Sequence, residues 1–164
     1  MSIKDYFEEQ EKTFVKFLQE HDCAYQLASG YGATEGGSAL AAVLSKDAYT
    51  FQSVGIPLPA NTISIFNYSV NDTGEVKATD NELPYNQIGE ICVTGPTLML
   101  KYLNNPELIN KKLVKHSDGK IWLHTGDKGY MDEEGHVYVI DRLKDIINRG
   151  GEIIFPIQIE EVIL

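Results

Sequence analysis

Three short strings of this sequence carry side chains that could bind a phosphorylated ligand. The first, residues 31–37 (YGATEGG), combines an aromatic ring, a hydroxyl and a carboxylate within five positions. Gly32 lets the backbone come close to a ligand or adopt a positive φ, and Tyr31 offers a flat face for stacking. Thr34 supplies a hydroxyl, and Glu35 is a hard oxygen ligand suited to Mg²⁺. An ordinary glycine turn explains the same spacing equally well.

The other two strings each carry one side chain that could bind a sugar. Residues 124–127 (HTGD) end in Asp127, whose carboxylate could accept two hydrogen bonds from a ribose diol. Residues 141–145 (DRLKD) contain Arg142, which could bind a sugar or a phosphate. Taken alone, a turn-forming Asp after Gly and a surface cluster of charges are the better explanations.

Composition narrows the classes of partner. The chain has 164 residues and a net charge of −10, which disfavours binding to nucleic acid and to anionic membranes but allows a small phosphorylated ligand. Cys23 and Cys92 show no metal-binding spacing, and two reduced thiols are favoured over a disulfide. The sequence contains no signal-peptide pattern and no apolar run long enough to span a bilayer. We therefore expect a cytoplasmic protein.

The elements that must position these side chains can be read from periodicity. An amphipathic helix is expected over 3–20, followed by a short strand at 23–28 that leads into the glycine-rich loop at 31–37. Asn105 and Pro106 indicate the start of another helix. Short apolar runs that alternate with turn signals predict a small β-barrel or sandwich. These runs are residues 62–66, 89–95, 121–127 and 135–141, with turns at 71–75 and 132–135.

We expect a mixed α/β chain in three parts. Residues 1–50 would be the trailing edge of an α/β domain, and residues 51–140 a distorted β-barrel subdomain. Residues 141–164 would be a hinge and the start of a further domain, because the charged segment 141–151 ends in a double glycine and a new strand follows.

Together, the strings resemble, in order, a series of motifs of the adenylate-forming superfamily, most closely those of AMP-forming acyl-CoA synthetases. The matching strings are YGATE, SVGIPLP, GEICVTGPTLMLKYLN, WLHTGD and DRLKDIINRGGEIIFPIQIEEV. The resemblance implies that a small carboxylic acid attacks the α-phosphate of ATP to give an acyl-adenylate and pyrophosphate. A thiol, often CoA, then displaces AMP. ATP, AMP, Mg²⁺ and CoA are the implied ligands.

The resemblance also implies roles for the glycine-rich string. Tyr31 would pack on the adenine, and Gly32 would allow close approach of the backbone. Thr34 would contact the α-phosphate, and Glu35 would help to hold Mg²⁺.

The later strings would bind the rest of the nucleotide and the thiol. Asp127 would bind the ribose hydroxyls, and Arg142 would also contact the ribose. Lys144 resembles the hinge about which a C-terminal domain rotates. Gly150 and Gly151 resemble the double glycine that lines the pantetheine tunnel of CoA-using members.

Two motifs of the family have no counterpart in the sequence. They are the Ser/Thr/Gly-rich phosphate loop and the catalytic lysine of the C-terminal domain. We therefore expect a fragment that needs the missing remainder of the enzyme as its partner and does not adenylate acids alone. Its uncovered apolar surface would favour self-association. Two alternatives stay open: a non-catalytic nucleotide-binding or interaction module, and a fragment of a peptide-synthetase adenylation domain, against which Lys144 and the double glycine argue.

Overall fold

The computed structural model describes residues 12–14, 16–22, 29–43, 50, 52–71, 76–103, 105–143, 147–149 and 152–154. Contacts divide the chain into two units, and residues 28–145 form the larger of them. In the smaller unit, residues 12–14 and 16–20 are helical, which confirms the described part of the helix expected over 3–20. The strand expected at 23–28 lies outside the described residues. No helix within the described ranges is long and apolar enough to span a membrane.

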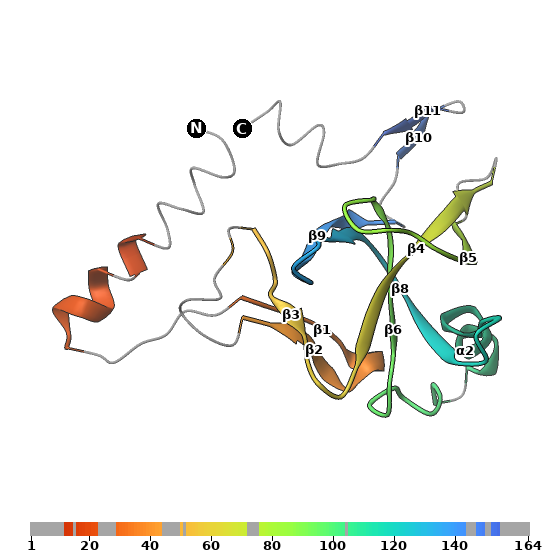
Figure 1. Cartoon of the computed structure of the whole chain (residues 1–164), viewed down its shortest axis with the longest axis horizontal. Coiled ribbons are helices and arrows are strands. Elements are labelled where there is room, and N and C mark those ends of the chain that lie inside the picture. The colour runs from red at the N-terminus through yellow and green to blue at the C-terminus, as the bar shows by residue number, and fades with distance from the viewer. Residues whose placement is uncertain are drawn as a thin grey trace. The chain divides into compact units, whose positions relative to one another are not determined.

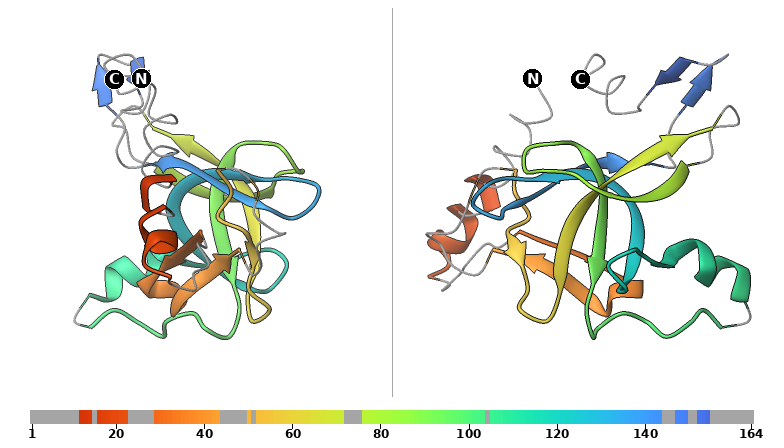
Figure 2. Two further views of the ribbon diagram at one scale, coloured as in Figure 1. Left: turned by 90° about the vertical axis from the view of Figure 1, so that its left-hand side faces the viewer. Right: turned by 45° about the vertical axis from the view of Figure 1, so that its right-hand side comes forward.

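An antiparallel sheet of six strands dominates the larger unit and curls into a half-barrel (Figures 1 and 2). The order of its strands is β5-β4-β6-β8-β7, and β9 pairs with the part of β8 that does not pair with β7. The strands are β4 (Thr62–Val70), β5 (Val76–Glu82), β6 (Gly89–Thr94), β7 (Leu113–Lys115), β8 (Ile121–Met131) and β9 (Val137–Arg142). The four apolar runs of the sequence therefore became β4, β6, β8 and β9, as predicted.

The centre of the sheet is β6, which is buried on both faces. Ile91 and Val93 face the main core, while Cys92 between them faces a second cluster with Phe66 and Trp122. Successive side chains of a strand point to opposite faces, so one strand contributes to two cores. Cys92 is a free thiol whose pKa is raised by burial and then by the charge of nearby Glu90, so it stays protonated.

A second, three-stranded antiparallel sheet carries the glycine-rich string. It consists of β1 (Gly30–Ala33), β2 (Ser38–Ala42) and β3 (Ile56–Pro57), and the short 3₁₀ helix η1 (Thr34–Gly36) joins β1 to β2. The prediction of a loop over 31–37 is therefore wrong for residues 31–33. Gly32 permits this pairing, because a Cβ at that position would overlap the carbonyl oxygen of Ser38.

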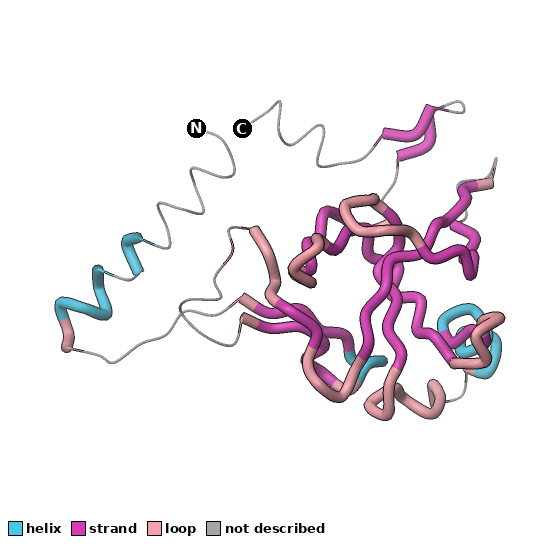
Figure 3. Tube along the Cα trace, viewed as in Figure 1, coloured by secondary structure: helices cyan, strands magenta, loops and turns pink. Residues whose placement is uncertain are grey.

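Helix α2 (Pro106–Lys112) precedes β7 and begins where the sequence predicted. The side chain of Asn105 accepts a hydrogen bond of 3.2 Å from the Leu108 amide, which satisfies one of the free donors of the first turn. In the smaller unit, β10 (Ile147–Arg149) and β11 (Glu152–Ile154) form an antiparallel pair, so the segment expected as a linker contains a strand. Among the described residues as a whole, strands outnumber helices (Figure 3).

Candidate functional site

Asp127 lies in the middle of β8 rather than at its end. Gly126 just before it adopts a φ of 82°, which favours glycine, and the pairing of β6 with β8 shifts register nearby. The Thr125 hydroxyl donates to the carbonyl of Ile91 (2.7 Å) and accepts from the Asp127 amide (3.1 Å). The HTGD string is therefore a bend within a long strand, and the sheet holds that bend in place.

The Asp127 carboxylate is held from two sides. The Tyr31 hydroxyl donates to Oδ2 (2.6 Å), and the Arg142 Nε lies 3.3 Å from Oδ1. Asp127 and Arg142 are cross-strand partners in the β8–β9 register. Burial raises the pKa of Tyr31, and the bond to Asp127 raises it further, so the phenol stays protonated and keeps donating. A carboxylate offers about four lone-pair sites, so Asp127 can accept from a ligand as well.

Glu35 is fixed by the segment that follows β6. One oxygen, Oε1, accepts a hydrogen bond of 2.7 Å from the Tyr102 hydroxyl, and the Met99 amide donates to the Glu35 carbonyl (2.8 Å). The bond from Tyr102 is the main cause that lowers the pKa of Glu35. Glu35 is therefore ionised at neutral pH, and its carboxylate is a suitable ligand for a cation.

The bond between Tyr102 and Glu35 predicts an alkaline transition. Burial first, and then the hydrogen bond to Glu35 and its negative charge, raise the pKa of Tyr102 to about 12. The folded pKa of this phenol lies above its unfolded pKa of about 10. The group therefore stabilises the fold when the pH is below the unfolded pKa. This contribution is lost as the pH rises towards the folded pKa.

An ultraviolet difference titration of wild type against Tyr102→Phe measures the pKa of Tyr102, and Glu35→Gln should move that pKa back towards the ordinary value. A wild-type Tyr102 that titrates at the ordinary value would contradict the assignment.

A cleft of about 850 Å³ brings most of the predicted residues together. Its lining includes Gly32, Thr34, Glu35, Asp127 and Arg142. Tyr31 lines a neighbouring hollow of about 650 Å³, formed largely by the small side chains of β1 and β2, and reaches the site through its bond to Asp127. The remaining predicted positions, Lys144, Gly150 and Gly151, lie outside the described residues.

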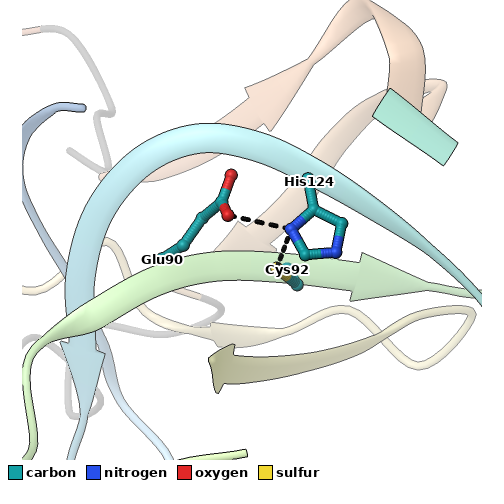
Figure 4. A group of neighbouring side chains, drawn as sticks. All are labelled: Glu90, Cys92 and His124. Carbon is teal, nitrogen blue, oxygen red and sulfur yellow. Dashed lines mark hydrogen bonds and ion pairs between the residues drawn. The ribbon is translucent and has the colours of Figure 1, made fainter. Parts of the chain in front are cut away.

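A buried polar network supports the HTGD bend. Figure 4 shows Glu90, Cys92 and His124 lying together between β6 and β8. Glu90 Oε2 accepts from His124 Nδ1 (2.8 Å), and its Oε1 accepts from the Gly126 amide (2.9 Å). The His124 Nδ1 also lies 3.4 Å from the Cys92 sulfur. One carboxylate therefore fixes both the imidazole and the backbone next to Asp127.

The same network extends to a second histidine. His124 Nε2 lies 2.9 Å from His116 Nε2, so one of the two nitrogens donates and the other accepts. Burial lowers the pKa of His116, which keeps this ring neutral. A glutamate inside the apolar run of β6 is the one sign of this network in the sequence.

Comparison with known proteins identifies the family. A family model described as AMP-binding enzyme matches residues 8–103, more than half of the chain. The chain is 36% identical over 152 residues to an acyl-CoA ligase of Aspergillus fumigatus, which covers 92% of this chain and 24% of that protein. It is 40% identical over 136 residues to 2-succinylbenzoate–CoA ligase of Oceanobacillus iheyensis, covering 82% and 24%.

A solved structure shares the fold. It is the o-succinylbenzoate CoA synthetase of Bacillus subtilis in complex with the acyl-adenylate intermediate OSB-AMP, with a TM-score of 0.64 and 33% identity. The match covers 84% of this chain and 25% of that one, so the chain spans about a quarter of the length of its relatives. The chain belongs to the family of AMP-binding, adenylate-forming enzymes.

Proposed function

We propose that the cleft holds the AMP portion of ATP and of an acyl-adenylate, as part of an AMP-forming acyl-CoA ligase. The observation that carries the proposal is the Asp127 carboxylate, fixed by Tyr31 and Arg142 in the same cleft as Thr34 and Glu35. The volume of the cleft lies within the range of about 300–1,000 Å³ that is usual for small-molecule sites. The names of the relatives, which are acyl-CoA ligases, support the same activity.

The ribose and the base would be held by three side chains. Asp127 accepts hydrogen bonds from the ribose hydroxyls, and Arg142 beside it contacts the same sugar. The carboxylate is mostly buried, so these charge-assisted bonds form with little competition from water. The ring of Tyr31 flanks the adenine while its hydroxyl keeps Asp127 oriented.

Thr34 and Glu35 would act on the phosphates. The exposed Thr34 hydroxyl donates to the α-phosphate, and the ionised Glu35 offers an oxygen to Mg²⁺. A single carboxylate suits this ion, which is usually held by one or two carboxylates together with the phosphates of the substrate. Bound there, Mg²⁺ supplies positive charge that offsets the charge of the phosphates.

Two displacements would follow from this binding mode. An oxygen of the carboxylic acid forms a bond to the α-phosphorus of ATP, and pyrophosphate leaves. The sulfur of CoA then forms a bond to the acyl carbon, AMP leaves, and the thiol proton passes to solvent. Asp127 and Arg142 keep the ribose in place through both steps. We also propose that Lys144 is the hinge and that Gly150 and Gly151 line the path of the pantetheine arm of CoA.

Isothermal titration calorimetry of the chain with adenosine, AMP and an acyl-sulfamoyl-adenosine analogue tests the proposal. We expect all three to bind at one site, and the analogue to bind most tightly because it also fills the acyl position. Cytidine monophosphate, which has the same ribose and phosphate but a smaller base, is the control and should bind more weakly than AMP. If none of the three adenosine compounds binds, the proposed function is wrong.

A further inference from the structure

Lys112, the last residue of α2, reaches from the helix to the bend that carries Asp127. Its Nζ donates to the carbonyl oxygens of His124 (3.0 Å) and Thr125 (2.8 Å). A Cβ placed on Gly126 would lie 3.2 Å from the same nitrogen. The ammonium therefore lies against the backbone just before Asp127, and Lys112 lines the cleft.

The cleft is more positive than the rest of the chain. The whole chain carries 24 acidic and 14 basic side chains. The lining of the cleft has four basic and three acidic side chains, a formal charge of 4 − 3 = +1: Lys77, Lys111, Lys112 and Arg142 against Glu35, Glu90 and Asp127. Each of these acids already accepts a hydrogen bond within the protein. The lining is therefore suited to an anionic ligand.

Lys112 acts on the end of the cleft where phosphate is expected. After the hydrogen bond from Tyr102, the charges of Lys112 and Arg142 contribute to lowering the pKa of Glu35. Such an effect falls with distance, so the ammonium is within electrostatic reach of Glu35, which follows Thr34 in η1. Of the four cations that line the cleft, Arg142 is already paired with Asp127, and Lys112 is the lysine whose charge acts on Glu35.

A purely structural role for Lys112 is the alternative. The ammonium ties α2 to β8 and lies at the helix C-terminus, where a positive charge offsets the helix dipole. An ammonium has three donors, however, and the two carbonyls take two of them. The third can go to a ligand, so the two roles make different predictions for ligands with and without phosphate.

We propose that Lys112 is a phosphate-binding residue of the cleft, anchored by the carbonyls of His124 and Thr125 so that its ammonium bonds the α-phosphate of a nucleotide. The inference rests on the proposed function, because it requires the ribose on Asp127. It adds a cation to the site that neither the motifs of the sequence nor the resemblance assigned.

Calorimetric titration with adenosine and with AMP separates the phosphate from the nucleoside. In Lys112→Met, we expect AMP to bind about 10- to 100-fold more weakly, the effect of one charge-assisted hydrogen bond. Adenosine should bind within about twofold of wild type, because no phosphate contact is lost. Lys112→Arg should recover part of the AMP affinity. Lys115→Met, which removes the same charge from the exposed end of β7, is the matched control and should leave both ligands unaffected.

Each other outcome overturns the inference in a recognisable way. Equal loss of adenosine and AMP in Lys112→Met would mean that Lys112 only supports the bend, and a circular-dichroism melt would show the accompanying loss of stability. Unchanged AMP affinity would exclude the phosphate contact. If wild type binds adenosine but gains nothing from the phosphate of AMP, the inference fails alone. If wild type binds neither, the proposed function fails and the inference with it.

Discussion

Replacing Asp127 by alanine should weaken binding of both adenosine and AMP by at least about 100-fold. The ribose loses its main acceptor, which amounts to about 3 kcal/mol of charge-assisted hydrogen bonding. Tyr31 and Arg142 also lose the partner that orients them. Asp127→Asn keeps one oxygen acceptor and should fall between wild type and the alanine variant. Calorimetry measures the affinities, and a thermal melt checks that each variant is folded.

A change in the ligand makes this test specific for the ribose contact. For wild type, 2′,3′-dideoxyadenosine should bind about as weakly as adenosine binds to Asp127→Ala. The variant itself should not distinguish the two ligands, because the contact is already lost. Glu107→Gln, at the exposed first turn of α2 and outside the cleft lining, is the control for a lost negative charge. An alanine variant that still prefers adenosine would show that another group holds the hydroxyls.

Replacing Glu90 by alanine should destabilise the fold by about 3–5 kcal/mol. This change leaves the His124 Nδ1 proton and the Gly126 amide without their acceptor, and Glu90 is only 3% exposed. Such a loss is a large share of the total stability of about 5–15 kcal/mol usual for a domain. Urea denaturation followed by circular dichroism gives the free energy of unfolding of each variant.

The isosteric variant Glu90→Gln separates shape from hydrogen bonding. Its amide oxygen can still accept from Gly126 or from His124 but not from both, so we expect a loss of about 1–2 kcal/mol. Glu134→Ala, in the exposed turn between β8 and β9, should change stability by less than about 0.5 kcal/mol. If Glu90→Ala were no less stable than Glu134→Ala, the buried network would have no structural role.

Strands with an apolar pattern were predictable from the sequence, and strands without one were not. β4 and β6 have apolar side chains in runs or in alternation, and α2 has an N-cap followed by Pro106. β1 and β2 consist mostly of Gly and Ala, which have little strand propensity, so only their pairing makes them strands. β5 is an edge strand of mainly polar residues, and such strands give almost no apolar signal.

In the candidate site too, some residues could be assigned from the sequence and others only from the structure. Resemblance assigned roles to Thr34, Glu35 and Asp127, and the fold places them along one cleft. Tyr102 and Lys112 were not assigned, because their contacts join segments that only the tertiary structure brings together. A lysine near the end of a short helix is most simply explained by the helix dipole, and the sequence alone offers no reason to look further.

The place of Asp127 within a strand has a kinetic consequence. The ladder of β8 fixes its backbone, and Tyr31 and Arg142 fix its carboxylate before any ligand arrives. A nucleotide therefore meets a group that is already in position, and little conformational entropy is lost when the ribose docks. The association rate should then be governed by diffusion and by the attraction of a positively charged cleft for a negatively charged ligand, without a slow rearrangement of the residues that hold the sugar.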